Sequence, residues 1–235
     1  MGKKYKRNDR KLWFRCVKAV LKIFVRKPKF KFLGDEFTDQ SIVLCNHIGM
    51  SGPLTNELYF PRNFRFWGTY EMNSGLKEVY KYLSTTYFHK KKHFKKGVAK
   101  LVSVVAAPVC NVFYKGIRLI STYPDHRFKN TINESLKTLK ENKSLIIFPE
   151  DSSNGYFDKL TSFFAGFIVL AKTCLKRGLD LPIYVCYFRK KDKKYIVDKP
   201  ILCSELLAQN LSRYEIAKNI CDRTNELGQM YTGEK

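Results

Sequence analysis

The sequence has few of the residue arrangements that build metal or redox centres. Its seven cysteines are scattered between positions 16 and 221, and no two stand in a C-x-x-C spacing. That spacing is typical of zinc knuckles and thioredoxin-like motifs. The four histidines also lack paired spacing. We therefore expect no metal site, and the odd, dispersed set of cysteines is typical of a reducing cytoplasm.

Acidic residues are scarce as well. Aspartate and glutamate number 21 against 44 lysines and arginines, which gives a formal net charge of +23 at pH 7. Such a charge concerns partners rather than fold. Nucleic acid, an anionic lipid surface and acidic small molecules such as nucleotide thioesters are the candidate partners. No nucleic-acid-binding motif is present, so we expect no nucleic-acid partner, although the basic run 90–96 keeps that alternative open.

Long hydrophobic runs are missing. No stretch of 18 uncharged apolar residues occurs, so a membrane-spanning helix is not expected. Lysines and arginines interrupt the N-terminal stretch where a signal peptide needs a continuous apolar core. The run 101–114 is too short to span a bilayer and contains Pro108, which we expect to kink it. It fits either a buried helix or one that contacts lipid.

Residues 1–35 are predicted to form a basic amphipathic segment. Basic residues recur every three or four positions between Lys11 and Arg26, which places them on one face of a helix. Apolar residues, among them Trp13 and Phe24, cover the other face. A helix with these two faces can lie in a membrane interface. The alternative is an ordinary surface helix packed on the core.

Residues 36–235 are predicted to form one α/β domain with a central, mostly parallel or mixed sheet flanked by helices. Short apolar runs indicate strands, and amphipathic patterns between them indicate helices. The predicted strands are 42–45, 116–121, 144–148, 181–188 and 193–201, and the predicted helices include 131–142, 163–177 and one that starts at Ser212. Residues 84–115 are a possible insertion.

Polar residues follow two of the predicted strands. Asn46 and His47 come directly after 42–45, and a run of four residues, "PEDS" (149–152), follows the buried run 144–148. Loops at strand ends of α/β sheets gather into one crevice and hold the ligand. We therefore expect these two loops to lie together.

Four blocks in this order resemble the glycerolipid acyltransferase family, whose members acylate glycerol 3-phosphate and lysophosphatidic acid. The N-H-x4-D block of the family is similar to residues 46–52, and its second block resembles "GIRLIST" (116–122). Its F-P-E-G-T/S block resembles "FPEDSS" (148–153), and its proline-containing strand resembles "LPIYVCY" (181–187). The resemblance runs from about residue 41 to residue 227. It implies a glycerol-3-phosphate acyltransferase-like fold.

The resemblance implies an enzyme that moves a fatty acyl group to a hydroxyl of a lysophospholipid or glycerolipid-like acceptor. The co-substrate is acyl-CoA or acyl carrier protein, and no cofactor is implied. His47 is implied as the general base, a role that an imidazole of ordinary pKa suits near neutral pH. The residues implied in substrate binding are Asn46, Gly116, Arg118, Pro149 and Ser152.

The chain departs from the family at the aspartate that orients the histidine, because this position is Gly52. We expect Asp151, and less favourably Glu150, to supply the displaced carboxylate. The alternative is that Asp151 caps a turn. Two arginines of the family are also replaced, by Thr122 and Ser153, which thins the usual phosphate site. These losses keep open a catalytically impaired, lipid-binding protein of the same fold.

The expected partners are anionic membrane lipids, an acyl thioester and a lysolipid acceptor. The expected location is cytoplasmic and peripheral, at the inner face of a membrane. Each basic residue near an anionic lipid surface contributes about 1 kcal/mol of attraction.

Overall fold

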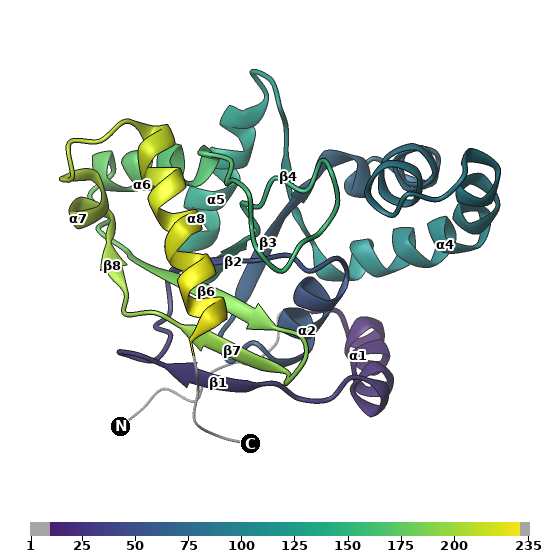
Figure 1. The fold of residues 1–235 in the computed structure, drawn as a ribbon, viewed down its shortest axis with the longest axis horizontal. Helices are drawn as coiled ribbons and strands as arrows, with labels where there is room; N and C mark the ends of the chain where they lie inside the picture. Colours follow the sequence, from purple (N-terminus) through teal and green to yellow (C-terminus); the bar gives the residue numbers. More distant parts are fainter. Residues whose placement is uncertain (1–9, 231–235) are drawn as a thin grey trace.

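The computed structural model describes residues 10–230, which form helices around one central sheet (Figure 1). The strand order is β1-β7-β6-β2-β5-β3-β4, and β8 pairs with β6. All pairs are parallel except those that β6 makes with β7 and β8. The predicted α/β domain with a mixed sheet is confirmed. The strands are β1 (Lys29–Phe32), β2 (Ile42–Cys45), β3 (Phe64–Thr69), β4 (Ile120–Thr122), β5 (Ser144–Ile147), β6 (Pro182–Arg189), β7 (Lys194–Val197) and β8 (Ile201–Leu202).

Eight α-helices lie within the described range, with one 3₁₀ and one π segment. The α-helices are α1 (Leu12–Phe24), α2 (Ser51–Tyr59), α3 (Leu76–Tyr82), α4 (Lys96–Ile117), α5 (Phe128–Lys140), α6 (Gly166–Lys176), α7 (Cys203–Leu207) and α8 (Arg213–Gln229). The 3₁₀ segment η1 is Tyr70–Asn73, and the π-helix η2, Leu83–Lys91, continues directly from α3.

A hydrophobic cluster covers each face of the sheet. Successive residues of a strand point to opposite faces. Ile42 and Leu44 of β2 therefore pack toward α5, α6 and α8, whereas Val43 and Cys45 join an aromatic cluster on the other face. Every residue of β2 and of β5 is buried, as is typical of parallel strands that are covered on both sides. The ends of these strands, rather than their faces, are left to carry polar chemistry.

Part of the predicted N-terminal segment 1–35 belongs to the sheet. Phe30 of β1 pairs with Tyr195 of β7, and the two rings stack with centroids 4.9 Å apart. The alternation of lysine and phenylalanine in "KFKF" has the two-residue period of a strand. Residues 1–9 of the predicted segment lie outside the described residues.

The strand predicted at 116–121 is wrong in its first half. Helix α4 passes through Pro108 and ends at Ile117, Arg118 then takes a left-handed conformation (φ 60°, ψ 54°), and β4 begins only at Ile120. The ring of Phe14 from α1 occupies the space where a side chain at residue 116 would lie, so the glycine lets the two helices touch. Gly116 therefore serves packing between helices.

By its length and composition, helix α4 could cross a membrane. No other helix among residues 10–230 meets the same criteria. The apolar run 101–114 had been expected to be too short, but the helix extends beyond it at both ends. Only 17% of the most apolar 18-residue stretch of α4 is buried. One such helix is weak evidence for a membrane span.

The two capping boxes expected from the sequence differ in outcome. At α8 the Ser212 hydroxyl accepts from the Glu215 N–H, and the Glu215 carboxylate accepts from the Ser212 N–H, as predicted. The box expected at Thr131 and Glu134 is wrong. Helix α5 begins three residues earlier, at Phe128, and Glu134 instead binds Arg65.

Helix α1 turns most of its apolar residues outward. Phe14 is buried, but Ile23 and Phe24 are 79% and 78% exposed. Lys18, from the basic face, points inward to the buried Glu57 of α2 at 2.8 Å. The picture of an ordinary helix whose apolar face packs on the core therefore does not describe α1.

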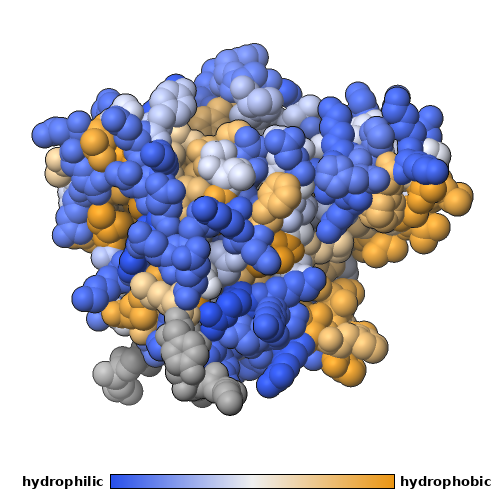
Figure 2. Space-filling view, viewed as in Figure 1, coloured by the Kyte–Doolittle hydropathy of each residue, from blue (hydrophilic) through white to orange (hydrophobic). Residues whose placement is uncertain are grey.

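The exposed apolar side chains of α1 and α4 form one region, named here the α1–α4 apolar surface. The rings of Phe14 and Phe113, 5.3 Å apart, join the two helices. Figure 2 shows apolar residues gathered over both helices at the right edge of the molecule. The exposed members on α4 are Val98, Leu101, Val104, Val105, Val109 and Val112, and those on α1 are Leu12, Trp13, Val17, Val20, Ile23 and Phe24.

Candidate functional site

Asn46 anchors the loop that follows β2. Its Nδ2 donates to the carbonyl oxygen of Phe188 at 3.1 Å, and its Oδ1 accepts from the N–H of Phe188 at 2.6 Å. The residue is fully buried between β2 and β6. Asn46 thus fixes the position at which the chain leaves β2, and the substrate-binding role implied for it stays a prediction.

The loop after His47 has a strained backbone conformation. Ile48 and Gly49 both have left-handed φ values, of 44° and 60°. For a β-branched residue such as Ile48 this conformation is a genuine outlier, and strain of this kind gathers at functional sites. The two residues turn the chain sharply into α2, where the N–H of Gly52 donates to the carbonyl oxygen of His47 at 3.2 Å.

The imidazole of His47 lies between two aromatic rings. It stacks on Tyr156 and meets the edge of Phe148, with centroids 5.0 Å apart in each case. Its Nδ1 is buried and has no hydrogen-bond partner among the described residues. The pKa of His47 is lowered to about 3, chiefly by burial and also by the charge of Lys91, while the backbone of Gly49 acts in the opposite direction. The ring is therefore neutral at physiological pH.

The two loops that were expected to lie together do meet. An oxygen of the Glu150 carboxylate, at the end of β5, accepts from the backbone N–H of His47 at 2.8 Å. Burial raises the pKa of Glu150, and this hydrogen bond partly offsets the shift. The contact joins residues 103 positions apart in the sequence. Glu150 thus holds the His47 backbone rather than its ring.

Asp151 makes the contacts of a turn cap. Its Oδ1 accepts from the backbone N–H of Ser153 at 3.0 Å and from the Ser153 hydroxyl at 2.5 Å. No hydrogen bond joins a carboxylate to the His47 ring within residues 10–230. The orienting role expected of Asp151 remains a prediction that these contacts do not supply.

The backbone at Gly52 leaves no room for the missing aspartate. A Cβ atom on Gly52 would lie 2.5 Å from the carbonyl oxygen of His47 and 3.1 Å from that of Asn46. Contacts that close with backbone atoms require the backbone to move. The replacement is therefore built into the way α2 starts, and it is more than the loss of one carboxylate.

The chain after Asp151 forms a loop whose two ends are held together by backbone hydrogen bonds. The N–H of Asp151 donates to the Ser162 carbonyl at 3.0 Å, and the N–H of Phe164 donates to the carbonyl of the buried Pro149 at 2.8 Å. These bonds close the neck of a loop, 152–161, whose ends lie side by side. The implied substrate contact of Pro149 stays a prediction, and its observed role is at this neck.

A lysine from a distant element enters the site. The Nζ of Lys91, the last residue of η2, donates to the Ser152 hydroxyl at 2.7 Å and lies 5.5 Å from the centroid of the Tyr156 ring. Burial lowers the pKa of Lys91, although nearby carboxylates act in the opposite direction. Irregular helical turns such as η2 are frequent at functional sites.

Sequence reasoning identified Ser152 but missed Lys91 and Tyr156. Lys91 lies in a basic run in which no single lysine stands out. Asn154-Gly155 is a turn signal that returns the loop toward its start, and it would have drawn attention to Tyr156. The sequence could not indicate that Lys91 binds Ser152, because 61 positions separate the two residues.

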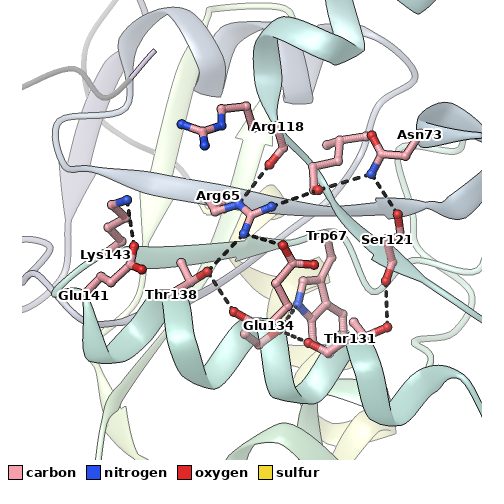
Figure 3. Close-up of polar contacts among 12 residues, drawn as sticks. Arg65, Trp67, Asn73, Arg118, Ser121, Thr131, Glu134, Thr138, Glu141 and Lys143 are labelled. Atoms are coloured by element: carbon pink, nitrogen blue, oxygen red, sulfur yellow. Dashed lines mark hydrogen bonds and ion pairs between the residues drawn. The ribbon is translucent and has the colours of Figure 1, made fainter. Parts of the chain in front are cut away.

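The structure does not bring Gly116 and Arg118 to His47. Arg118 lies between the end of α4 and the start of β4, where its carbonyl accepts from Arg65 (Figure 3). By strand register it is level with Ile42, about five residues or roughly 16 Å before His47. A polar cavity of about 210 Å³ opens at that end of the sheet. Its lining is Arg10, Arg65, Arg118, Glu134, Lys137, Thr138, Glu141 and Lys143.

The side chains around His47 include groups that can exchange protons with a substrate. No group of three or more histidine, cysteine or acidic side chains in the described range is placed to hold a metal ion. The site instead combines a neutral imidazole with a hydroxyl and an amine in contact. These are the groups that take and deliver protons when an oxygen attacks a carbonyl carbon.

Comparison with known proteins adds distant likeness to solved structures. No protein-family model matches the chain, and no curated protein does. Among solved structures, the chain is similar to the 1-acyl-sn-glycerophosphate (LPA) acyltransferase, PlsC, from Thermotoga maritima. The two are 12% identical, the match covers 94% of this chain and 80% of that one, and the TM-score is 0.48. At that score the likeness assigns no role to any residue.

Proposed function

We propose that this protein is an O-acyltransferase with His47 as its general base. It moves a fatty acyl group from acyl-CoA or acyl carrier protein to a hydroxyl of a lysophospholipid or glycerolipid-like acceptor. One observation carries the proposal. The two segments that resemble acyltransferase blocks, 46–52 and 148–153, meet at the hydrogen bond between the His47 backbone and Glu150.

In the proposed reaction the neutral imidazole accepts the proton of the acceptor hydroxyl. The acceptor oxygen attacks the thioester carbonyl carbon, the carbon–sulfur bond breaks, and the thiolate leaves with a proton. A base whose pKa is near 3 removes a proton less readily than one near neutrality. Loss of the orienting acid in a Ser-His-Asp triad lowers turnover about 10⁴-fold. We therefore expect slow turnover unless bound substrate supplies a partner for Nδ1.

A second candidate is a lipid-binding protein that has lost catalysis. The buried Nδ1 of His47 without a partner favours it, as does the packing of Gly52 against the His47 backbone. It predicts binding of lysolipids and acyl thioesters without consumption of either.

We also propose that the α1–α4 apolar surface docks on the cytoplasmic face of an anionic membrane. Soluble proteins rarely expose contiguous apolar areas of this kind. Leu101 and Val105 on α4 are 72% and 73% exposed. Exposed lysines, among them Lys95, Lys96 and Lys100, stand at the start of the same helix, where they would meet acidic headgroups.

The test of the proposed function is an acyl-transfer assay at a lipid surface. Purified protein, bound to anionic vesicles, is incubated with labelled acyl-CoA or acyl carrier protein and a panel of lysolipids. We expect an acylated lipid that the His47→Ala variant does not form. Vesicle and lysolipid binding without thioester consumption, in a folded protein, would establish the second candidate instead.

A further inference from the structure

We propose that Ser152 and Lys91 form a nucleophile–base pair, and that Ser152 carries the acyl group as a covalent ester before it reaches the acceptor. The inference rests on the proposed acyl transfer and adds an intermediate to it. Direct attack of the acceptor on the thioester needs no such ester.

The geometry is that of an activated serine. Lys91 Nζ and Ser152 Oγ are 2.7 Å apart, inside the range in which a base takes the proton of a nucleophile. The contact joins η2 to the loop after β5, so it depends on tertiary folding. Ser152 is 8% exposed and sits at the closed neck of its loop, which fixes its position. Serine–lysine pairs are a recurring variant of the serine–histidine arrangement.

The surroundings of Lys91 favour the amine that such a base requires. Its side chain is partly buried over Tyr156, and burial lowers its pKa more than the neighbouring carboxylates raise it. The carboxylates that act on it are Glu150, Asp151 and Glu71. A lysine in this setting loses its proton more easily than an exposed one, and catalytic lysines arise in this way.

The pair also supplies what His47 lacks. The His47 ring has no acid to hold its charge, so it is a weak base for a first attack on the thioester. Tyr156 lies against both centres, since it stacks on His47 and lies below the Lys91 amine. Tyr156 thus links the two centres, and in the proposed order His47 is left with the second step only.

The proposed steps balance. Ser152 Oγ attacks the thioester carbonyl carbon while its proton passes to the neutral amine of Lys91. The carbon–sulfur bond breaks, and the thiolate leaves with that proton, so Lys91 is neutral again. The acceptor hydroxyl, its proton taken by His47, then attacks the Ser152 ester. Ser152 Oγ leaves with the proton that His47 took, so His47 is neutral again, and the acyl group ends on the acceptor.

The experiment uses two reagents and two matched pairs of variants. The full-length protein is treated with an alkyl fluorophosphonate, or with acyl-CoA without acceptor, and the adduct is mapped by peptide mass spectrometry. We expect labelling at Ser152. Ser152→Ala should abolish it, and Lys91→Met should slow it about 10²-fold or more, as loss of a general base does. Ser153→Ala and Lys92→Met change the adjacent serine and lysine, and both should still be labelled at Ser152.

Two results of the labelling experiment would overturn the inference. One is a folded protein, shown by an unchanged thermal transition, whose Ser152 stays unmodified by the fluorophosphonate. The other is equal labelling in Lys91→Met and Lys92→Met, which would leave the Lys91–Ser152 bond purely structural. If lysolipid acylation persists in Ser152→Ala, the covalent step fails but the proposed function stands. Labelling of Ser152 without acylation of any acceptor would count against the proposed function alone.

Discussion

At the scale of single residues, Gly52 determines which contacts hold His47 in place. In the family that the chain resembles, an aspartate at this position orients the histidine. Here the start of α2 lies so close to the His47 carbonyl that even a methyl group has no space. Glu150 takes the backbone N–H of His47, and no acid reaches the ring. Among the described residues, the carboxylate that binds His47 therefore contacts its main chain and not its ring.

Restoring the aspartate should therefore fail. Gly52→Asp is expected to give no more acyl transfer than the parent, and both Gly52→Asp and Gly52→Ala should lower the free energy of unfolding by about 1–3 kcal/mol through overpacking. Denaturant unfolding measures this change. Gly97→Ala on α4 is the matched control, because a Cβ there meets no atom within 4 Å. A gain of activity in Gly52→Asp would show that the loop makes room for a carboxylate.

The pKa of His47 gives a second prediction at this scale. In a histidine-labelled protein followed by NMR, the His47 ring should titrate near pH 3 rather than near 6.5, the ordinary pKa of a histidine side chain. Lys91→Met should raise this pKa, because the charge of Lys91 helps to lower it. A midpoint near 6.5 in the parent protein would contradict the buried, unpartnered ring.

The same shift predicts how stability depends on pH. Because the pKa of His47 is lower in the folded chain, the unfolded chain binds the proton first as pH falls. The His47 contribution is complete above about pH 6.5 and is lost toward pH 3, by up to about 1.4 kcal/mol per pH unit. The difference in unfolding free energy between the parent and His47→Gln should follow this course. A difference independent of pH would exclude the linkage.

At the scale of secondary-structure elements, helices α1 and α4 both expose apolar side chains. Polar contacts hold α1 at the surface of the molecule. Glu57 of α2 binds both Arg10 and Lys18 and is itself fully buried. Removal of one partner of a buried pair costs about 3–5 kcal/mol. These contacts fix α1 with its apolar side outward, and that side continues into the exposed stripe of α4.

The stripe of α4 gives the element-scale prediction. The double variant Leu101→Ser and Val105→Ser should weaken binding to anionic vesicles, because burial of each apolar side chain contributes about 1.5–3 kcal/mol. Vesicle sedimentation measures the affinity. The control is Leu202→Ser with Leu211→Ser, which changes exposed leucines outside α1 and α4. Equal binding by the two double variants would separate α4 from the membrane.

The elements also show what the sequence can and cannot predict. The runs that became β2, β5 and β6 are continuous and apolar, and a fully buried parallel strand needs that pattern. Helix α2 was missed because Gly52 and Pro53 hide its short amphipathic pattern. The end of α4 was misplaced, because the helix ends at a left-handed arginine, Arg118, rather than at the glycine that usually takes this conformation.

The whole molecule places its polar site and its apolar surface on different elements of one domain. Strand order alone brings the loops after β2 and β5 together, which is why the meeting of 46–52 with 148–153 was predictable. The neighbours of His47 were harder to predict, because Lys91 and Tyr156 belong to segments outside the recognised blocks. Arg118 lies away from His47 because its block is split between the end of α4 and β4, and its part in substrate binding stays a prediction.

The central claim is that His47 takes a proton from a lipid hydroxyl during acyl transfer. It is tested most directly by the rate of lysolipid acylation, measured at pH 7.5 on anionic vesicles for the parent and for His47→Gln, with thermal transitions recorded for both. We predict measurable transfer by the parent and a loss of about 10²–10⁴-fold in the variant, the usual effect of removing a general base. Equal rates in two folded proteins, or no transfer by the folded parent to any acceptor of the panel, would contradict the claim.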